Sequence, residues 1–117
     1  MKNRLVKSAV FAAIAVGLVA APTAAQAARG LYSYQGSDYS YDYTTKYQVQ
    51  IHDGENDGNR VKAQYKTSPN GATKELINNA GYNTNAYQTL SGVPEAHRAV
   101  EILTARPDAY GDWKYPR

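Results

Sequence analysis

The residues of this chain that could do chemistry are few, and they form no known catalytic pattern. His52 and His97 are the only histidines, and the chain has no cysteine. No H-E-x-x-H or G-x-S-x-G motif is present, so metal-dependent and serine-dependent hydrolysis have no recognisable residues. Carboxylate pairs for sugar hydrolysis could be drawn from Asp53, Glu55, Asp57, Glu75 and Glu101, but any acidic surface offers such pairs. We therefore predict that the protein is not an enzyme and has no catalytic residue and no cofactor.

Three carboxylates, Asp53, Glu55 and Asp57, stand in a short glycine-rich segment and match the first half of a calcium-binding loop of the EF-hand type. The match then ends, because Gln64 stands where the closing bidentate glutamate belongs. We predict a solvated turn and no metal site, since Asp and Gly are typical turn residues. A weak calcium site made from the three carboxylates is the alternative.

Aromatic residues are the most distinctive part of the composition, with 11 Tyr and one Trp against a single Phe. Tyrosine combines an apolar ring with a hydroxyl group, which suits binding surfaces. Tyr110, Trp113 and Tyr115 lie close together in the sequence, and we predict that they bind a ligand such as a sugar or a protein partner. For most of the other tyrosines we expect a place in the core.

Strands must position these residues, and the clearest pattern runs from Tyr47 to Lys66. In its first half Tyr47, Val49 and Ile51 alternate with Gln48, Gln50 and His52, and in its second half Val61, Ala63 and Tyr65 alternate with polar residues. This period of two is typical of strands with one buried face. With the turn residues 53–59 between them, the two runs predict a β-hairpin.

Further short strands are predicted at 73–78 and 86–90, with a turn at 67–71. Residues 95–106 are ambiguous: Pro94 suits a helix start, whereas a strand would turn Val100 and Ile102 inward. We predict the strand, and hence an all-β fold, a small antiparallel β-sandwich of about five strands. The alternative is an α+β fold with a helix at 95–106.

The N-terminal residues 1–27 predict a secretory signal peptide, with three basic residues, an apolar run and an Ala-Gln-Ala end. Cleavage after Ala27 would leave 90 of the 117 residues, with ten Lys and Arg against ten Asp and Glu. This zero net charge argues against binding nucleic acid, and no second apolar run would hold the chain in a membrane. We expect residues 28–40 to form a Tyr-rich, partly disordered arm and residues 41–117 a single β domain with a core built on tyrosine.

Three stretches resemble segments of small secreted proteins of actinomycetes that have no assigned activity: residues 52–58, residues 63–65, and the ending from Arg98 to Trp113. The resemblance implies an exported all-β domain and names no site. We therefore expect a secreted, extracellular, non-catalytic binding protein that is monomeric or weakly associating, with an unknown extracellular protein or carbohydrate as its partner. The alternative is a secreted antagonist, either a small antimicrobial protein or an enzyme inhibitor, for which the loop 78–85 is the best contact candidate.

Overall fold

The computed structural model describes residues 29–117, and the predicted signal peptide 1–27 lies outside them. Eight strands are present: β1 (Tyr32–Gln35), β2 (Asp38–Asp42), β3 (Gln48–Asp53), β4 (Arg60–Lys66), β5 (Lys74–Asn78), β6 (Thr84–Thr89), β7 (Ala96–Ile102) and β8 (Ala109–Tyr110). In this part of the chain no helix is long and apolar enough to cross a membrane.

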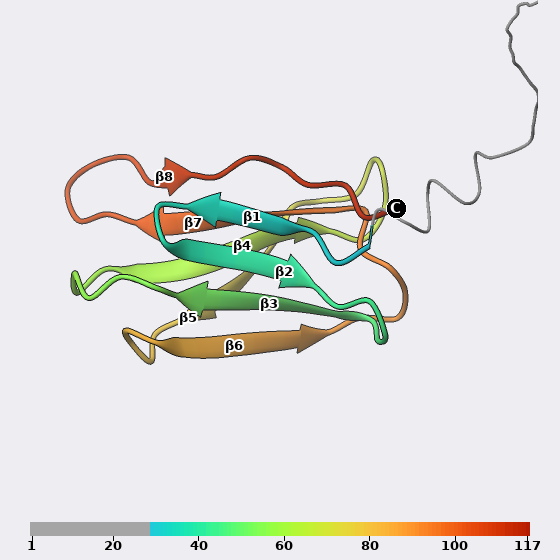
Figure 1. Cartoon of the computed structure of the whole chain (residues 1–117). Coiled ribbons are helices and arrows are strands. Elements are labelled where there is room, and N and C mark those ends of the chain that lie inside the picture. The colour runs from blue at the N-terminus through green and yellow to red at the C-terminus, as the bar shows by residue number, and fades with distance from the viewer. Residues whose placement is uncertain (1–28) are drawn as a thin grey trace, which may run out of the picture.

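The strands form two antiparallel sheets that pack face to face (Figure 1). The front sheet has the order β1-β2-β3-β6, and the back sheet has the order β5-β4-β7-β8. The all-β prediction is confirmed, with eight strands instead of about five. Residues 96–102 are the central strand β7, so the helix alternative is wrong.

The predicted hairpin is wrong although both of its strands exist. β3 pairs with β2 and β6 in the front sheet, whereas β4 pairs with β5 and β7 in the back sheet. Residues 54–59 therefore cross from one sheet to the other, a segment we call the crossover. An alternating pattern shows that a strand has one buried face, and two such faces can pack across a core as well as side by side.

The expected disorder in residues 28–40 is also wrong for the described residues, because Tyr32–Gln35 and Asp38–Asp42 are strands. The carboxylate of Asp42 accepts hydrogen bonds from the amides of Gly30 (2.7 Å) and Leu31 (2.9 Å), which fixes the start of the domain. Gly36 has φ +59°, and this conformation closes the β1–β2 turn. The ordered domain thus includes the segment that we had assigned to an arm.

The core between the sheets is small and aliphatic, and tyrosine contributes little to it. It consists of Val49, Ile51, Val61, Ala63, Tyr65 and Ala99. β2 turns Ser40 and Asp42 inward, opposite Ile51 and Val49 in the register, so Tyr39 and Tyr41 point outward. The link 43–47 between β2 and β3 shifts the alternation by one residue, and this shift overturns the predicted Tyr-built core.

β7 also faces the opposite way from our prediction. Glu101, Ala99 and His97 lie opposite Val61, Ala63 and Tyr65 of β4, so these alternate residues of β7 face the front sheet. Val100 and Ile102 are on the outer face of the back sheet. Val100 is nevertheless fully buried there, between its register partners Lys62 and Tyr110.

Candidate functional site

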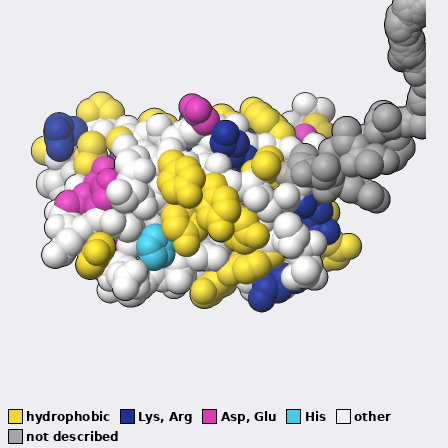
Figure 2. Space-filling model, in the orientation of Figure 1, with side chains coloured by type: hydrophobic (Ala, Val, Ile, Leu, Met, Phe, Trp, Pro, Cys, Tyr) yellow, Lys and Arg dark blue, Asp and Glu magenta, His cyan; other side chains and the backbone are white. Residues whose placement is uncertain are grey.

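The outer face of the front sheet carries six tyrosines whose rings touch in a continuous group, which we call the tyrosine face. Its members are Tyr32, Tyr34, Tyr39, Tyr41, Tyr43 and Tyr87, contributed by β1, β2, the β2–β3 link and β6. Ring centroids of neighbours are 4.5 to 6.4 Å apart. Figure 2 shows the resulting cluster of apolar side chains across the front of the molecule.

Polar side chains with neutral hydrogen-bonding groups border these rings. The Tyr43 hydroxyl donates to Gln50 Oε1 (2.6 Å), and Gln50 Nε2 donates to Asn85 Oδ1 (2.7 Å). The His52 ring stacks on Tyr39 at 4.7 Å and bonds the same Asn85 oxygen through Nδ1 (2.8 Å). These contacts fix the rings and amides of the tyrosine face in one arrangement.

Two cationic side chains, Arg29 and Lys46, lie at one end of the tyrosine face, and both contact groups of the same chain. Arg29 donates to the carbonyl oxygens of Tyr43 and Lys46, each at 3.0 Å, and its guanidinium lies 5.5 Å from the Tyr47 ring centroid. Lys46 Nζ lies 4.7 Å from the Tyr43 ring. The outward side chains of β1, β2, β3 and β6 include no aspartate, no glutamate and no aliphatic residue.

The predicted ligand-binding aromatics lie on the other sheet. Tyr110 and Trp113 each pack on the guanidinium of Arg98, at 4.2 and 4.5 Å from their ring centroids. Arg98 also donates to Gln64 Oε1 (2.8 Å). Tyr115 is 57% exposed, and no ring contact joins it to the other two. The structure therefore brings Tyr110 and Trp113 together around an arginine of the same chain and leaves Tyr115 apart.

A serine, a histidine and an aspartate form a hydrogen-bonded row inside the sandwich. Ser40 Oγ lies 2.7 Å from His97 Nδ1, and His97 Nε2 lies 2.9 Å from Asp42 Oδ1. The same three groups serve hydrolases as a catalytic triad. Here all three residues are 0% exposed, so no substrate reaches the Ser40 hydroxyl. The row is a polar connection between β2 and β7, and it joins the two sheets.

Burial alone would raise the pKa of Asp42, but hydrogen bonds outweigh this effect. His97 and the amides of Gly30 and Leu31 all donate to the carboxylate and hold the pKa of Asp42 below its usual value. The charged form of Asp42 is therefore the one that the fold stabilises.

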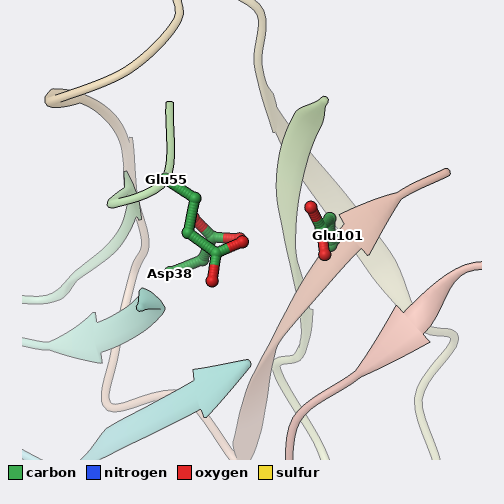
Figure 3. Close-up of side chains that lie close together, drawn as sticks. All are labelled: Asp38, Glu55 and Glu101. Carbon is green, nitrogen blue, oxygen red and sulfur yellow. The ribbon is translucent and has the colours of Figure 1, made fainter. Parts of the chain in front are cut away.

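Three carboxyl groups meet at the end of the sandwich where the crossover passes, and we call them the carboxylate cluster. Asp38 belongs to β2, Glu55 to the crossover and Glu101 to β7, and one oxygen of each lies within 4.8 Å of the others. Figure 3 shows the carboxyl groups of Asp38 and Glu55 next to each other and that of Glu101 on β7, a strand of the opposite sheet. Both sheets and the crossover thus contribute to the cluster.

The cluster perturbs the titration of two of its members. Burial, reinforced by the charges of Glu55, Asp53 and Glu101, raises the pKa of Asp38 to about 7, although a hydrogen bond from the Gly54 amide opposes the change. The hydrogen bond with Asp57, together with burial, raises the pKa of Glu101. Without a counter-charge, the fold therefore favours the protonated, neutral form of Asp38 up to a pKa of about 7.

The three carboxylates of the predicted turn, Asp53, Glu55 and Asp57, make different contacts in the structure. Asp53 Oδ1 accepts from the Glu55 amide (3.2 Å), and Asp57 Oδ1 accepts from the Asn59 amide (2.9 Å), so both shape the backbone of the crossover. Glu55 alone of the three joins the carboxylate cluster. The sequence therefore predicted the turn chemistry but not the partners of Glu55.

A pocket of about 240 Å³ lies between the crossover and the loop 79–83, lined mainly by asparagine and glycine with Asp53, Arg60 and Tyr82. Its volume is below the roughly 300 to 1,000 Å³ of typical small-molecule sites. The loop is braced by Asn78, whose side chain donates to the Thr84 carbonyl oxygen (3.0 Å) and accepts from the Ala80 amide (2.9 Å). Tyr82 is 56% exposed in this loop.

Comparison with known proteins gives no relative: no protein-family model, no curated protein and no solved structure matches the chain. The resemblance to secreted proteins of actinomycetes therefore stays a prediction.

Sequence analysis missed both the tyrosine face and the carboxylate cluster. For the first, Tyr39 and Tyr41 alternate with Ser40 and Asp42, and hydrophobicity alone predicts that the aromatic side is buried, whereas the polar side is. For the second, Asp38 and Glu101 lie 63 positions apart in the sequence, and no local pattern predicts that they meet.

Proposed function

We propose that the protein is a secreted, non-catalytic binding protein whose tyrosine face takes a neutral polysaccharide. The observation that carries the proposal is the composition of this face, which is built from phenol rings, amides and an imidazole. Sugar rings pack their apolar C–H faces on aromatic rings, and their hydroxyl groups pair with neutral donors and acceptors. The signal-peptide pattern of residues 1–27 supports the secreted location.

The size and charge of the tyrosine face also suit an uncharged chain. It runs across the four strands of the front sheet, a width of about 14 Å at the usual strand spacing, which accommodates several sugar units. The two cations near the tyrosine face, Arg29 and Lys46, lie at its rim, so the strands themselves offer a sugar chain only neutral donors, acceptors and rings. A tyrosine-rich surface could also suit a protein partner, and a protein that binds no polysaccharide would point to that alternative.

The test is binding of the purified full chain to a panel of neutral and charged polysaccharides, measured by affinity electrophoresis and calorimetry. We expect binding to at least one neutral polymer, and Tyr34→Ala, which removes a 58% exposed ring from the tyrosine face, should weaken it roughly tenfold. Tyr115→Ala is the matched control, because it removes an equally exposed ring elsewhere and should leave binding unchanged.

Two results would count against this function. One is a folded protein that binds no neutral polysaccharide in the panel. The other is an equal loss of affinity in the Tyr34→Ala and Tyr115→Ala variants, which would place the binding surface outside the tyrosine face.

A second candidate function, inhibition of a secreted enzyme, rests on the loop 79–83. An inhibitor needs an exposed loop held in one conformation, and Asn78 braces this loop while Tyr82 projects from it. Inhibition of a panel of secreted hydrolases that is lost in Tyr82→Ala and retained in Tyr34→Ala would favour this candidate over polysaccharide binding.

A further inference from the structure

The carboxylate cluster poses a physical problem that the polysaccharide-binding function does not use. Asp38 is 0% exposed, and within the described chain its Oδ2 has no hydrogen-bond partner. Buried polar atoms are normally paired, and a buried carboxylate without a counter-charge is costly. The carboxyl groups of Glu55 and Glu101 lie next to that of Asp38. In the described part of the chain, the cluster therefore has many hydrogen-bond acceptors and no positive charge to balance them.

A second unpaired acceptor lies beside the first. Gln35 stands directly opposite Asp38 in the β1–β2 register, and its Oε1 is also buried without a donor. Side chains at opposite positions of an antiparallel pair are neighbours on one face of the sheet. An unpaired amide oxygen on β1 is therefore the register neighbour of the unpaired Asp38 carboxylate.

We infer that the carboxylate cluster, together with Gln35, is a calcium site that links the two sheets. Carboxylate and amide oxygens are the ligands that calcium prefers. The three carboxyl oxygens lie within 4.8 Å of one another, so one ion with Ca–O distances of 2.3–2.6 Å can reach all three. Magnesium demands near-ideal octahedral geometry and gives up its waters reluctantly, so a site of three carboxylates and an amide suits calcium better.

The backbone around the cluster is already arranged to hold these side chains. Gly54 donates its amide to Asp38 Oδ1 (2.8 Å), and Ser37 donates its amide to Glu55 Oε2 (2.9 Å). Asn59 Nδ2 donates to Glu101 Oε2 (2.9 Å). A side chain at Gly36 would collide with the Glu55 carboxylate, so the β1–β2 turn leaves room for it. Each carboxyl group is thus oriented by a donor and still has acceptor capacity for a cation.

This calcium site differs from the one that the sequence pattern raised as an alternative, because the ligands differ. The calcium-loop pattern comprises Asp53, Glu55 and Asp57, and it lacks a closing glutamate. In the folded protein Glu101 of β7 supplies a carboxylate from the opposite sheet, and Asp38 supplies one from β2. A bound calcium ion would bring the crossover and both sheets together at this end of the sandwich.

The experiment is a calorimetric titration of the chelator-treated full chain with calcium chloride near pH 7.5, repeated with magnesium chloride. We expect a single saturable site for calcium and weaker binding of magnesium. A few millimolar calcium should raise the melting temperature by about 5 to 10 °C relative to chelator. Asp38→Asn and Glu101→Gln should each weaken calcium binding at least about tenfold.

Glu75→Gln is the matched control, because it removes one carboxylate from the outer face of the back sheet, and calcium affinity should not change. Glu55→Gln is a second cluster variant, in the crossover outside the strands, for use if Asp38→Asn does not fold. Absence of saturable calcium binding by the folded wild-type chain would overturn the inference. So would an equal loss of affinity in Glu75→Gln, or unchanged affinity in the cluster variants.

Discussion

Strand β2 directs Tyr39 and Tyr41 toward solvent and Asp38, Ser40 and Asp42 into the space between the sheets. On the outer side, aromatic rings cover one another and the neighbouring amides. On the inner side, polar groups are paired across the sandwich, as in the Ser40–His97–Asp42 row, or remain unpaired, as Asp38 Oδ2 does. Buried polar groups make folding depend on exact partners, whereas the outer rings can be exchanged at lower cost. The inner face thus specifies the fold, and the outer face is free to serve binding.

The sharpest test of this contrast compares the two histidines. His97→Ala should lower the free energy of unfolding by about 3–5 kcal/mol, because Asp42 and Ser40 would remain buried without their partner. His52→Ala, on the outer face against Tyr39, should cost about 1 kcal/mol or less. Urea unfolding measures both. Equal costs would mean that the buried row does not join the sheets.

The next largest effect concerns neighbouring residues of β3. Ile51 is fully buried in the core, and Ile51→Ala should cost about 2–5 kcal/mol through lost burial and the cavity left behind. Gln50 points to the outer face, where it is 7% exposed and bonds Tyr43 and Asn85, and Gln50→Ala should cost about 1–2 kcal/mol. Urea melts of the pair test the facing of β3, which would be wrong if Gln50→Ala were the more damaging change.

The pH dependence of stability sharpens the contrast within the inner face. In chelator, Asp38 keeps its proton in the folded state up to a pKa of about 7, so stability should fall as pH rises from about 4 through 7. The expected loss is roughly 1–4 kcal/mol, since Asp53, Glu55 and Glu101 face the same carboxyl group. Asp42 acts oppositely, because its lowered pKa makes its contribution disappear as pH falls below about 4.

Thermal melts across this pH range in chelator, with the wild-type chain and Asp38→Asn, provide the measurement. The variant should lose the decline between about pH 4 and pH 7 and keep the acid limb. A decline that persists in Asp38→Asn would assign it to another group.

The sequence predicted β3 to β7 well because alternation and turn residues are local signals, whereas β1 and β2 overlap the predicted arm and β8 was not predicted. β4 faces as expected, and β7 was recognised as a strand despite a good helical pattern. It predicted poorly which strands pair with each other. Residues far from β3 and β4 in the sequence determine that these two strands belong to different sheets. Residues 67–71, by contrast, do connect the paired strands β4 and β5.

The prediction of which side chains face the core was wrong where aromatic and polar residues alternate. Hydrophobicity alone predicts that Tyr39 and Tyr41 are buried. In the structure Ser40 and Asp42 are buried instead, because both form hydrogen bonds with His97. His97 lies 55 positions from Asp42 in the sequence, so no local pattern indicates this contact. The carboxylate cluster was unpredictable for the same reason. Both sites depend on contacts that exist only after the two sheets have packed.

The tail after β8 secures the first strand of the domain. Ser33 of β1 bonds both the Ala99 amide and the Asp112 carbonyl oxygen, and Lys114 exchanges two backbone hydrogen bonds with His97. Contacts between residues this far apart form slowly and late, because a long loop must close first. A growing chain has all four strands of its front sheet once residue 89 has left the ribosome, but the contact that ties β1 to the tail must wait for residue 112.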